Sequence, residues 1–299
     1  FDASEKRDGS IMGYYTDDNN DGMYDLIFMS EEPIYANKDS NYLFFRLTGL
    51  TSIDLSNFKT DGVKNMRYMF YNCSGLTSLD VSNFNTSQVG NMSGMFYSCS
   101  GLTSLDVSNF NTSQVTAMYA MFNGCSGLTS LDVSNFNTSN VTDMRGMFNG
   151  CRGLTSLDVS NFNTSQVTTM SEMFKGCSGL TSLDVSNFDT SQVTSMKAMF
   201  ISCRGLTSLD VSNFNTSQVT DMSHMFYYCE NLTSLYVSEY NSATQKGWTT
   251  ENVTSSSTMF DSCTKLVGGN GTKFNSSYTD KTYARIDTAS TPGYLTKKN

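Results

Sequence analysis

Residues 102–127, LTSLDVSNFNTSQVTAMYAMFNGCSG, decide the fold because near-copies of this stretch recur through most of the chain. The repeat is easiest to follow through the cysteines. Seven of them are spaced by 26 residues and the last follows after 34: Cys73, Cys99, Cys125, Cys151, Cys177, Cys203, Cys229 and Cys263. A fixed period of this size is typical of solenoids, in which each unit buries its apolar face only against its neighbours. We therefore expect one elongated stack of coils.

The repeat divides the chain into three parts. Eight units cover residues 50–263 and begin at Leu50, Leu76, Leu102, Leu128, Leu154, Leu180, Leu206 and Leu232. Residues 1–49 lack the repeat, and their alternation of apolar and polar residues on both sides of residues 17–22 predicts a β-hairpin. Residues 264–299 mix short apolar runs with turn residues. Because a solenoid needs its open ends covered, we interpret both flanks as mostly β caps.

Each unit is predicted to hold a strand, a corner and a short helix. Apolar and polar residues alternate in residues 105–108, as in a strand, so that stacking would build a parallel sheet. The corner N-F-N-T-S ends in a Ser/Thr pair that suits a helix N-cap. The apolar residues that follow have the spacing of one helix face: Val115, Met118, Met121, Phe122 and Cys125. Gly127 would end this helix, and the expected fold class is an α/β solenoid.

The cysteine and methionine ladders raise the question of a metal or redox site. Structural zinc needs ligands that converge tetrahedrally, usually from close pairs such as C-x-x-C. Here single thiols are spaced by one coil, ~5 Å in a stacked sheet, and this alignment also makes a poor disulfide framework. We expect buried, inert thiols and no cofactor. The cysteines therefore do not decide the redox compartment.

Composition excludes several classes of function. A formal net charge of −9 and a pI near 4.6 argue against a nucleic-acid partner. No apolar run is long enough for a membrane span in this segment. The chain contains one histidine, His224, with no recognisable catalytic partner, so we expect no enzyme. The sequence begins at Phe1 without a charged and then apolar leader, so we expect it to be a mature or excised piece of a longer protein.

One acidic turn matches the beginning of a calcium loop. Asp17, Asn19 and Asp21 stand at the ligand positions, and Gly22 follows them. The twelfth position, which should supply a bidentate glutamate, is Phe28. We treat these residues as a weak Ca²⁺ candidate beside the plainer interpretation of an acidic turn.

The predicted strand face repeats one aspartate in almost every unit: Asp54, Asp80, Asp106, Asp132, Asp158, Asp184 and Asp210. Carboxylates ~5 Å apart repel by about 1 kcal/mol per neighbouring pair when water screens them. Each is therefore expected to accept hydrogen bonds from Ser, Thr or backbone N–H groups. This acidic row either satisfies such donors or forms a flat periodic site for cations or for a repeating ligand such as a polysaccharide.

The predicted helix side varies between copies. Two columns of variable residues are Arg67, Ser93, Tyr119, Arg145, Ser171, Lys197 and Ser223, and Tyr71, Tyr97, Asn123, Asn149, Lys175, Ile201 and Tyr227. They form either a solvated surface or a tuned contact surface. The last unit carries eight extra residues around residues 245–248 and most of an aromatic cluster that is either a binding site or cap packing: Tyr227, Tyr228, Tyr236, Tyr240 and Trp248.

The corner motif Asn-Thr-Ser also matches the acceptor for N-glycosylation. It recurs at Asn85, Asn111, Asn137, Asn163 and Asn215, whereas one copy has Asp189 in place of the asparagine. A ladder of asparagines and hydroxyls at the solenoid corner explains this recurrence better than glycosylation does.

Residues 128–151, LTSLDVSNFNTSNVTDMRGMFNGC, resemble the BspA-like leucine-rich repeats of bacterial surface proteins. The resemblance covers residues 50–263 and implies a right-handed solenoid of leucine-rich-repeat type. It also implies a secreted or cell-surface location and adhesion to host or bacterial proteins or glycans, and it carries over no catalytic residues. One departure is Asn109, which comes one residue early for the usual asparagine ladder.

The leading hypothesis is an extracellular binding or adhesion module that presents an extended surface to a protein or glycan. The alternative is a structural spacer or assembly unit without a dedicated ligand site. A third interpretation, an intracellular interaction scaffold, is compatible with the free thiols. The sequence leaves open the ligand, the face that binds it and the oligomeric state.

Overall fold

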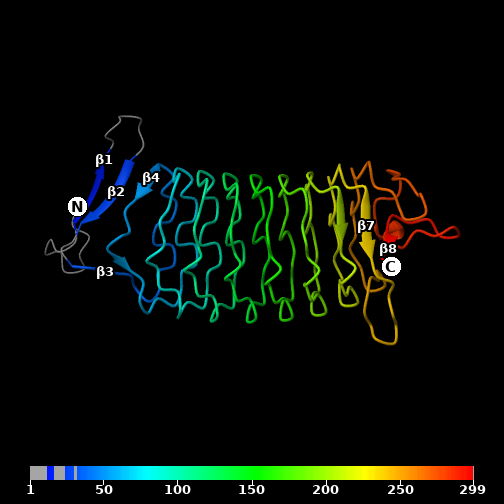
Figure 1. Ribbon diagram of the computed structural model, residues 1–299, viewed down its shortest axis with the longest axis horizontal. Helices are drawn as coiled ribbons and strands as arrows, with labels where there is room; N and C mark the ends of the chain where they lie inside the picture. Colours follow the sequence, from blue (N-terminus) through cyan, green and yellow to red (C-terminus); the bar gives the residue numbers. More distant parts are fainter. Residues whose placement is uncertain (1–11, 17–23, 30–31, 299) are drawn as a thin grey trace.

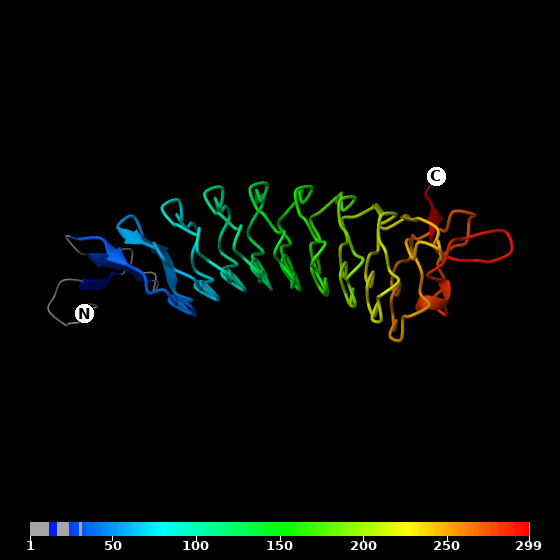
Figure 2. The ribbon, with the colours of Figure 1, turned by 90° about the horizontal axis from the view of Figure 1, so that it is seen from below.

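The computed structural model describes residues 12–16, 24–29 and 32–298, with side chains from residue 32 onward. The protein is an elongated row of stacked coils, and residues 12–16 and 296–297 lie at opposite ends of the row (Figures 1 and 2). Successive coils are joined by parallel bridges at one position of each repeat, beginning with Asp39↔Asn65 and Asn65↔Asn91 and ending with Asp221↔Ser255. The structure is thus a repeated domain with parallel pairing, as predicted.

The β-strands β1 to β8 lie toward the two ends of the row. At the N-terminal end β1 (Met12–Thr16) and β2 (Tyr24–Met29) form an antiparallel hairpin, and β2 pairs in parallel with β4 (Leu50–Ile53). The β3 strand (Ile34–Tyr35) pairs with β5 (Phe58–Lys59). At the C-terminal end β6 (Ser208–Asp210), β7 (Ser234–Val237) and β8 (Thr296–Lys297) form a parallel sheet, and η1 (Lys281–Tyr283) is a short 3₁₀ helix. The hairpin prediction is confirmed.

The predicted parallel sheet does not run through the central coils. There the L-T-S-L-D-V segments carry only long contacts such as Thr103 N–H to the Thr77 carbonyl at 3.5 Å. Side chains replace the backbone ladder: the Asn109 amide nitrogen donates to the carbonyls of Val81 and Phe84, both at 3.0 Å. The equivalent asparagine does the same in the following coils, so an asparagine ladder is present although Asn109 comes one residue early.

The predicted short helices are wrong. No α-helix occurs in residues 32–298, and residues 66–73 form instead what we call the turn segment, which every coil repeats. Alternate N–H groups cross to the next coil, as from Tyr68 to the Ser93 carbonyl (2.9 Å) and from Phe70 to the Met95 carbonyl (2.8 Å). Tyr68 and Asn72 have φ values of 55° and 56°. Since an α-helix needs right-handed residues and bonds to the fourth preceding carbonyl, this backbone cannot be helical.

The core is one continuous ladder of the periodic apolar residues. In the coil that begins at Leu102 each of them is at most 7 % exposed: Leu102, Leu105, Val107, Phe110, Val115, Met118, Met121, Phe122 and Cys125. Phenylalanines stack from coil to coil, as Phe96 does on Phe122 with centroids 5.7 Å apart. This confirms that the repeat builds a single core.

All eight cysteines are buried and free. Each thiol donates to a carbonyl of the preceding coil, as Cys99 does to Phe70 at 3.0 Å. Burial raises the pKa of the Cys73 thiol to about 11 and that of Cys125 to about 12. The predicted buried thiols are therefore confirmed, and they remain protonated at neutral pH.

The Asn-Thr-Ser corner is a second ladder. The buried Thr112 hydroxyl accepts from the Asn137 N–H at 2.7 Å and donates to the Asn137 carbonyl at 3.0 Å. Asn111 closes its own turn by accepting from the Ser113 N–H. These contacts recur in neighbouring coils. The recurrence of the Asn-Thr-Ser motif is therefore explained by hydrogen bonds between coils, as the sequence predicted.

Candidate functional surfaces

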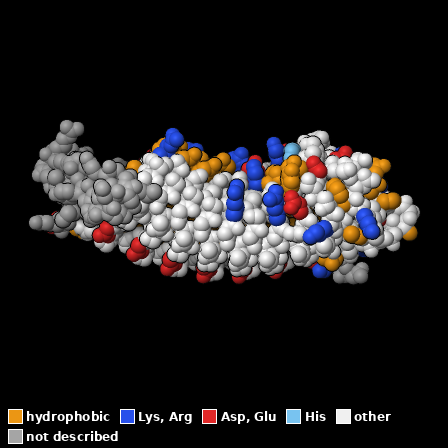
Figure 3. All heavy atoms as spheres, turned by 90° about the horizontal axis from the view of Figure 1, so that it is seen from above, with side chains coloured by type: hydrophobic (Ala, Val, Ile, Leu, Met, Phe, Trp, Pro, Cys, Tyr) orange, Lys and Arg blue, Asp and Glu red, His pale blue; other side chains and the backbone are white. Residues whose placement is uncertain are grey.

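The acidic row lies along one edge of the molecule, where Figure 3 shows a line of red side chains. Each carboxylate accepts the N–H of the serine two residues later, as Asp106 does from Ser108 at 2.9 Å. Hydrogen bonds from the Ser108 N–H and hydroxyl lower the pKa of Asp106, and equivalent bonds lower those of its neighbours. The predicted hydrogen bonding is confirmed, and the row is negatively charged at neutral pH.

The last member of the row is neutralised by the C-terminal cap. Asp210 forms an ion pair with Lys298 at 2.7 Å. Burial acts to raise the pKa of Asp210, but hydrogen bonds from Lys298 and Ser212 outweigh it, so this pKa is also lowered. Within residues 32–298 no group of three or more His, Cys, Asp or Glu side chains is arranged to hold a metal ion. The weak Ca²⁺ candidate, Asp17, Asn19 and Asp21, lies outside the described residues.

The predicted C-terminal aromatic cluster is divided between different places. Tyr227 and Tyr228 touch, with ring centroids 4.4 Å apart, and His224 packs against Tyr227. Trp248 is buried, and its indole N–H donates to the Ala284 carbonyl of the cap at 2.9 Å. Trp248 is therefore cap packing and cannot serve as an exposed binding residue, which corrects that part of the prediction.

The two other tyrosines lie near the last strands. Tyr236 belongs to β7 and lies beneath the Lys298 ammonium, 5.2 Å from the ring centroid. Tyr240 is half-buried at the start of the insertion. Both positions agree better with a role in closing the stack than with one shared binding site.

A larger aromatic surface, which the sequence analysis missed as a unit, lies on the turn segments of the first coils. We call it the aromatic row; it consists of Tyr42, Phe45, Tyr68, Tyr71 and Tyr97. Centroid distances are 5.2 Å for Tyr42–Tyr68, 4.9 Å for Phe45–Tyr71 and 4.7 Å for Tyr71–Tyr97. Tyr42 and Phe45 are 41 % and 39 % exposed. The rings thus contact one another at the molecular surface, where Tyr68, Tyr71 and Tyr97 are half-buried.

Basic side chains accompany these rings. The Arg67 guanidinium lies 4.7 Å from the centroid of Tyr68, and that of Arg46 lies 5.9 Å from Phe45. Figure 3 shows hydrophobic side chains together with Lys and Arg side chains next to the grey residues, on the edge that also carries the pale-blue histidine. Opposite charges therefore line the two edges of this face, acidic on one and mainly basic on the other.

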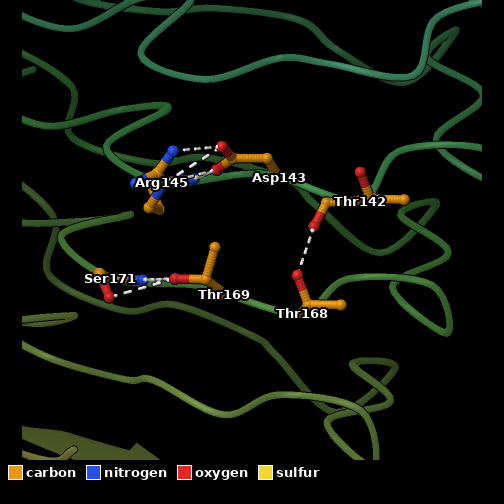
Figure 4. A network of polar contacts seen from close by, with 6 residues as sticks. All are labelled: Thr142, Asp143, Arg145, Thr168, Thr169 and Ser171. Carbon is orange, nitrogen blue, oxygen red and sulfur yellow. Dashed lines mark hydrogen bonds and ion pairs between the residues drawn. The ribbon is translucent and has the colours of Figure 1, made fainter.

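Further along the same turn segments the surface becomes polar. The Arg145 guanidinium covers Tyr119 and binds both oxygens of Asp143, at 2.7 to 3.1 Å (Figure 4). In the next coil the Thr168 hydroxyl donates to the Thr142 carbonyl at 3.3 Å. On these turn segments Arg145 is thus paired with a carboxylate of its own coil, whereas the aromatic row is concentrated near the N-terminal end.

One signal in the sequence could have revealed the aromatic row. Tyr42, Phe44 and Phe45 stand 26 residues before Tyr68, Phe70 and Tyr71. The Tyr42 N–H donates to the Arg67 carbonyl and Tyr42 has a φ of 59°, as in every turn segment. The end of the predicted cap is therefore a further copy of the turn segment, hidden because Ser40 and Leu47 replace the usual methionine and cysteine.

Comparison with known proteins gives one family match. A family model described as "Mycoplasma protein of unknown function, DUF285" matches residues 38–156, 125–240 and 184–291. The matches overlap, as expected for a repeated domain, and the first includes the additional turn segment. No curated protein and no solved structure matches. Within the described residues no helix is long and apolar enough to cross a membrane.

Proposed function

The chain belongs to the DUF285 family, and from this premise we propose that it is an extracellular or cell-surface binding module that mediates adhesion to a protein partner. The observation that carries the proposal is the aromatic row, because aromatic side chains that reach the surface beside arginine are typical of the energetically dominant part of protein interfaces. The proposal includes a right-handed stack of eight coils like that of the BspA-like leucine-rich repeats, without catalysis and without a nucleic-acid partner.

The aromatic row is already ordered before a partner arrives. Tyr71 stacks between Phe45 and Tyr97, and Tyr42 packs against Tyr68 with an angle of 31° between their rings. Ordering a free side chain at an interface costs about 0.5–1.5 kcal/mol, and stacked rings avoid much of this cost. The row therefore favours binding through preorganisation.

The stacking also favours a protein over a sugar at this surface. Tyr71 and Tyr97 are nearly parallel, with an angle of 15° between their rings, so these ring faces already contact each other. Ring edges and hydroxyls remain for a partner, and ring edges carry partial positive charge. Together with Arg46 and Arg67 they complement carbonyl and carboxylate oxygens of a polypeptide.

The alternative is a spacer or assembly unit of a surface protein. It is favoured by the uniformity of the central coils, in which the core, the corner ladder and the acidic row are nearly the same from coil to coil. A spacer needs such regularity, whereas recognition needs a distinctive surface such as the aromatic row.

The test is a triple substitution of the row, Phe45→Ser, Tyr71→Ser and Tyr97→Ser. The full chain on beads should adhere to host matrix proteins or bacterial cells, and the triple variant should lose at least tenfold of this adhesion. The matched control is Asn123→Ser, Asn149→Ser and Ile201→Ser, which changes the same column in later coils. Circular dichroism checks that both variants fold. Equal adhesion by the two variants would exclude the aromatic row as the binding surface. If the wild-type chain did not adhere, the result would favour the spacer function.

A further inference from the structure

Two departures from the repeat, 57 residues apart in the chain, meet at one cavity. The first is Asp189, which replaces the corner asparagine found at Asn163 and Asn215. The second is the insertion of the last unit, which contributes Lys246. In Figure 1 the insertion is the yellow-orange loop that extends below the row of coils near β7. The cavity is an open depression of about 580 Å³ in the surface, and Asp189 and Lys246 are both exposed.

The insertion forms one wall of the cavity, and several backbone contacts fix its conformation. Asn241 and Lys246 pair as an antiparallel bridge, and the Thr216 N–H donates to the Gly247 carbonyl at 3.1 Å. Gly247 has a φ of 101°, and a Cβ there would meet the Glu239 carbonyl at 2.5 Å, so only glycine fits this turn. The buried Trp248 anchors the far side to the cap. The wall is therefore held in place by the same residues that close the stack.

Most of the residues that line the cavity have polar side chains, although apolar atoms form about as much of its surface as polar ones. The side-chain amide nitrogens of Asn187 and Asn213 donate hydrogen bonds to carbonyls of the preceding coil, at 2.7 to 3.1 Å. Among the residues that the structure describes, no donor reaches the side-chain oxygens of these two asparagines. Asp189 accepts the Ser191 N–H with one oxygen only, at 2.9 Å. Lys246 forms no ion pair with any residue from 32 to 298. The cavity thus offers acceptors and one ammonium donor to a ligand.

We propose that this cavity binds a neutral, hydroxyl-rich sugar unit of a glycan. Asp189 and Lys246 carry opposite charges, so the cavity has no net charge that would select a strongly anionic or cationic ligand. The other lining groups are mainly amides and hydroxyls, which hydrogen-bond to sugar hydroxyls. Phe188 also lines the cavity, but it is only 2 % exposed, so little of its ring is available to a ligand. A volume of several hundred Å³ is usual for small-ligand pockets. The site is separate from the aromatic row.

The experiment titrates the full chain with lactose, maltose and N,N′-diacetylchitobiose and follows the side-chain amide NMR signals. We expect saturable shifts at Asn187 and Asn213 with at least one disaccharide. Asp189→Asn restores the repeat and so should fold; it is expected to weaken binding at least fivefold, as is Lys246→Gln. The matched control, Asn163→Asp, places a carboxylate at the same corner one coil earlier and should leave the affinity unchanged.

Three results would overturn the proposal. They are the absence of shifts with all three disaccharides, equal affinity of the wild-type chain and the two cavity variants, and binding of glycine or inorganic phosphate without any sugar. The triple variant of the aromatic row should keep its sugar binding, so that failure at one surface is distinguishable from failure at the other.

Discussion

Ser202 illustrates the strain that individual residues carry in the turn segments. It has a φ of 58°, in the left-handed region, while the same position one and two coils earlier is Gly176 and Gly150. A left-handed backbone costs a non-glycine residue about 1–2 kcal/mol, and the greater freedom of glycine in the unfolded chain offsets about 0.5–1 kcal/mol of that. Replacing Ser202 by glycine should therefore be favourable.

We predict that Ser202→Gly raises the free energy of unfolding by about 0.5–1 kcal/mol and that Gly150→Ser lowers it by a similar amount. A Cβ at Gly150 would meet the nearest atom, the Gly124 N or Cα, at 3.5 Å, which is ordinary contact, so the cost there is mainly backbone strain. Urea unfolding followed by circular dichroism measures both shifts. Shifts of the same sign in the two variants would contradict this account.

At the scale of elements, the repeat predicted the inward-facing residues correctly and the backbone of one segment wrongly. Val115, Met118, Met121, Phe122 and Cys125 are all buried, as the predicted helix face required. A turn segment with left-handed residues at every fourth position also brings these side chains inward, so the apolar spacing does not distinguish the two backbones. Alanine, glutamate, histidine and tyrosine occupy these left-handed positions as well as glycine, which conceals the signal.

The strand prediction failed in the central coils for a different reason. Alternation of apolar and polar residues indicates an extended segment, and residues 105–108 show that burial pattern. Whether neighbouring extended segments bond through the backbone depends on competing side chains. Here the Asp106 carboxylate accepts a hydrogen bond from the Ser108 N–H, and the Asn109 side-chain amide donates to two carbonyls of the preceding coil.

The candidate sites depended on long-range geometry that a repeat pattern does not contain. Comparison of the copies identified Tyr71 and Tyr97 as variable, but not their stacking on Phe45, which belongs to a segment without the usual methionine and cysteine. Asp189 and the insertion were both visible as departures from the repeat. Their meeting at one cavity follows from where the insertion folds, and no local pattern predicts that.

At the scale of the whole molecule, the acidic row should make stability depend on pH. Hydrogen bonds lower the folded-state pKa values of Asp106, Asp132 and Asp158 from 3.8. A lowered pKa stabilises the folded state above the unfolded value, and this contribution is lost as pH falls through the folded value. The melting temperature should therefore fall as the pH drops below about 4.

The triple variant Asp106→Asn, Asp132→Asn and Asp158→Asn should show a weaker fall over the same pH range. Asparagine keeps an oxygen for the serine N–H, as Asn111 does for Ser113 at 3.0 Å, but it has no carboxylate to protonate. Melting curves recorded from neutral pH to about pH 2 provide the measurement, because that range includes both protonation states. Gln88→Ala, Gln114→Ala and Gln166→Ala form the control and should retain the wild-type slope. An unchanged slope in the aspartate variant would assign acid sensitivity to other groups.

The translational regularity of the stack leads to a prediction about its length. Deleting residues 128–153 joins Gly127 to Leu154, which reproduces the junction of Gly153 with Leu154 and removes one complete 26-residue period. The core ladder, the corner ladder and the acidic row would each lose the residues of one coil and remain in register. In a repeat protein stability is approximately a sum over units and their interfaces. The shortened chain should therefore fold, with a moderately lower melting temperature.

Small-angle X-ray scattering should show that this deletion shortens the molecule by about one coil spacing, ~4.8 Å. Removing only residues 128–140 takes out half a period and would place the turn segment of one coil against the corner of the next. That variant should lose its cooperative unfolding transition, because buried threonine and asparagine groups would lose their partners. Equal behaviour of the two deletions would mean that the 26-residue register does not hold the stack together. The aromatic row and the cavity lie outside the deleted unit, so the 26-residue deletion should also preserve both proposed binding activities.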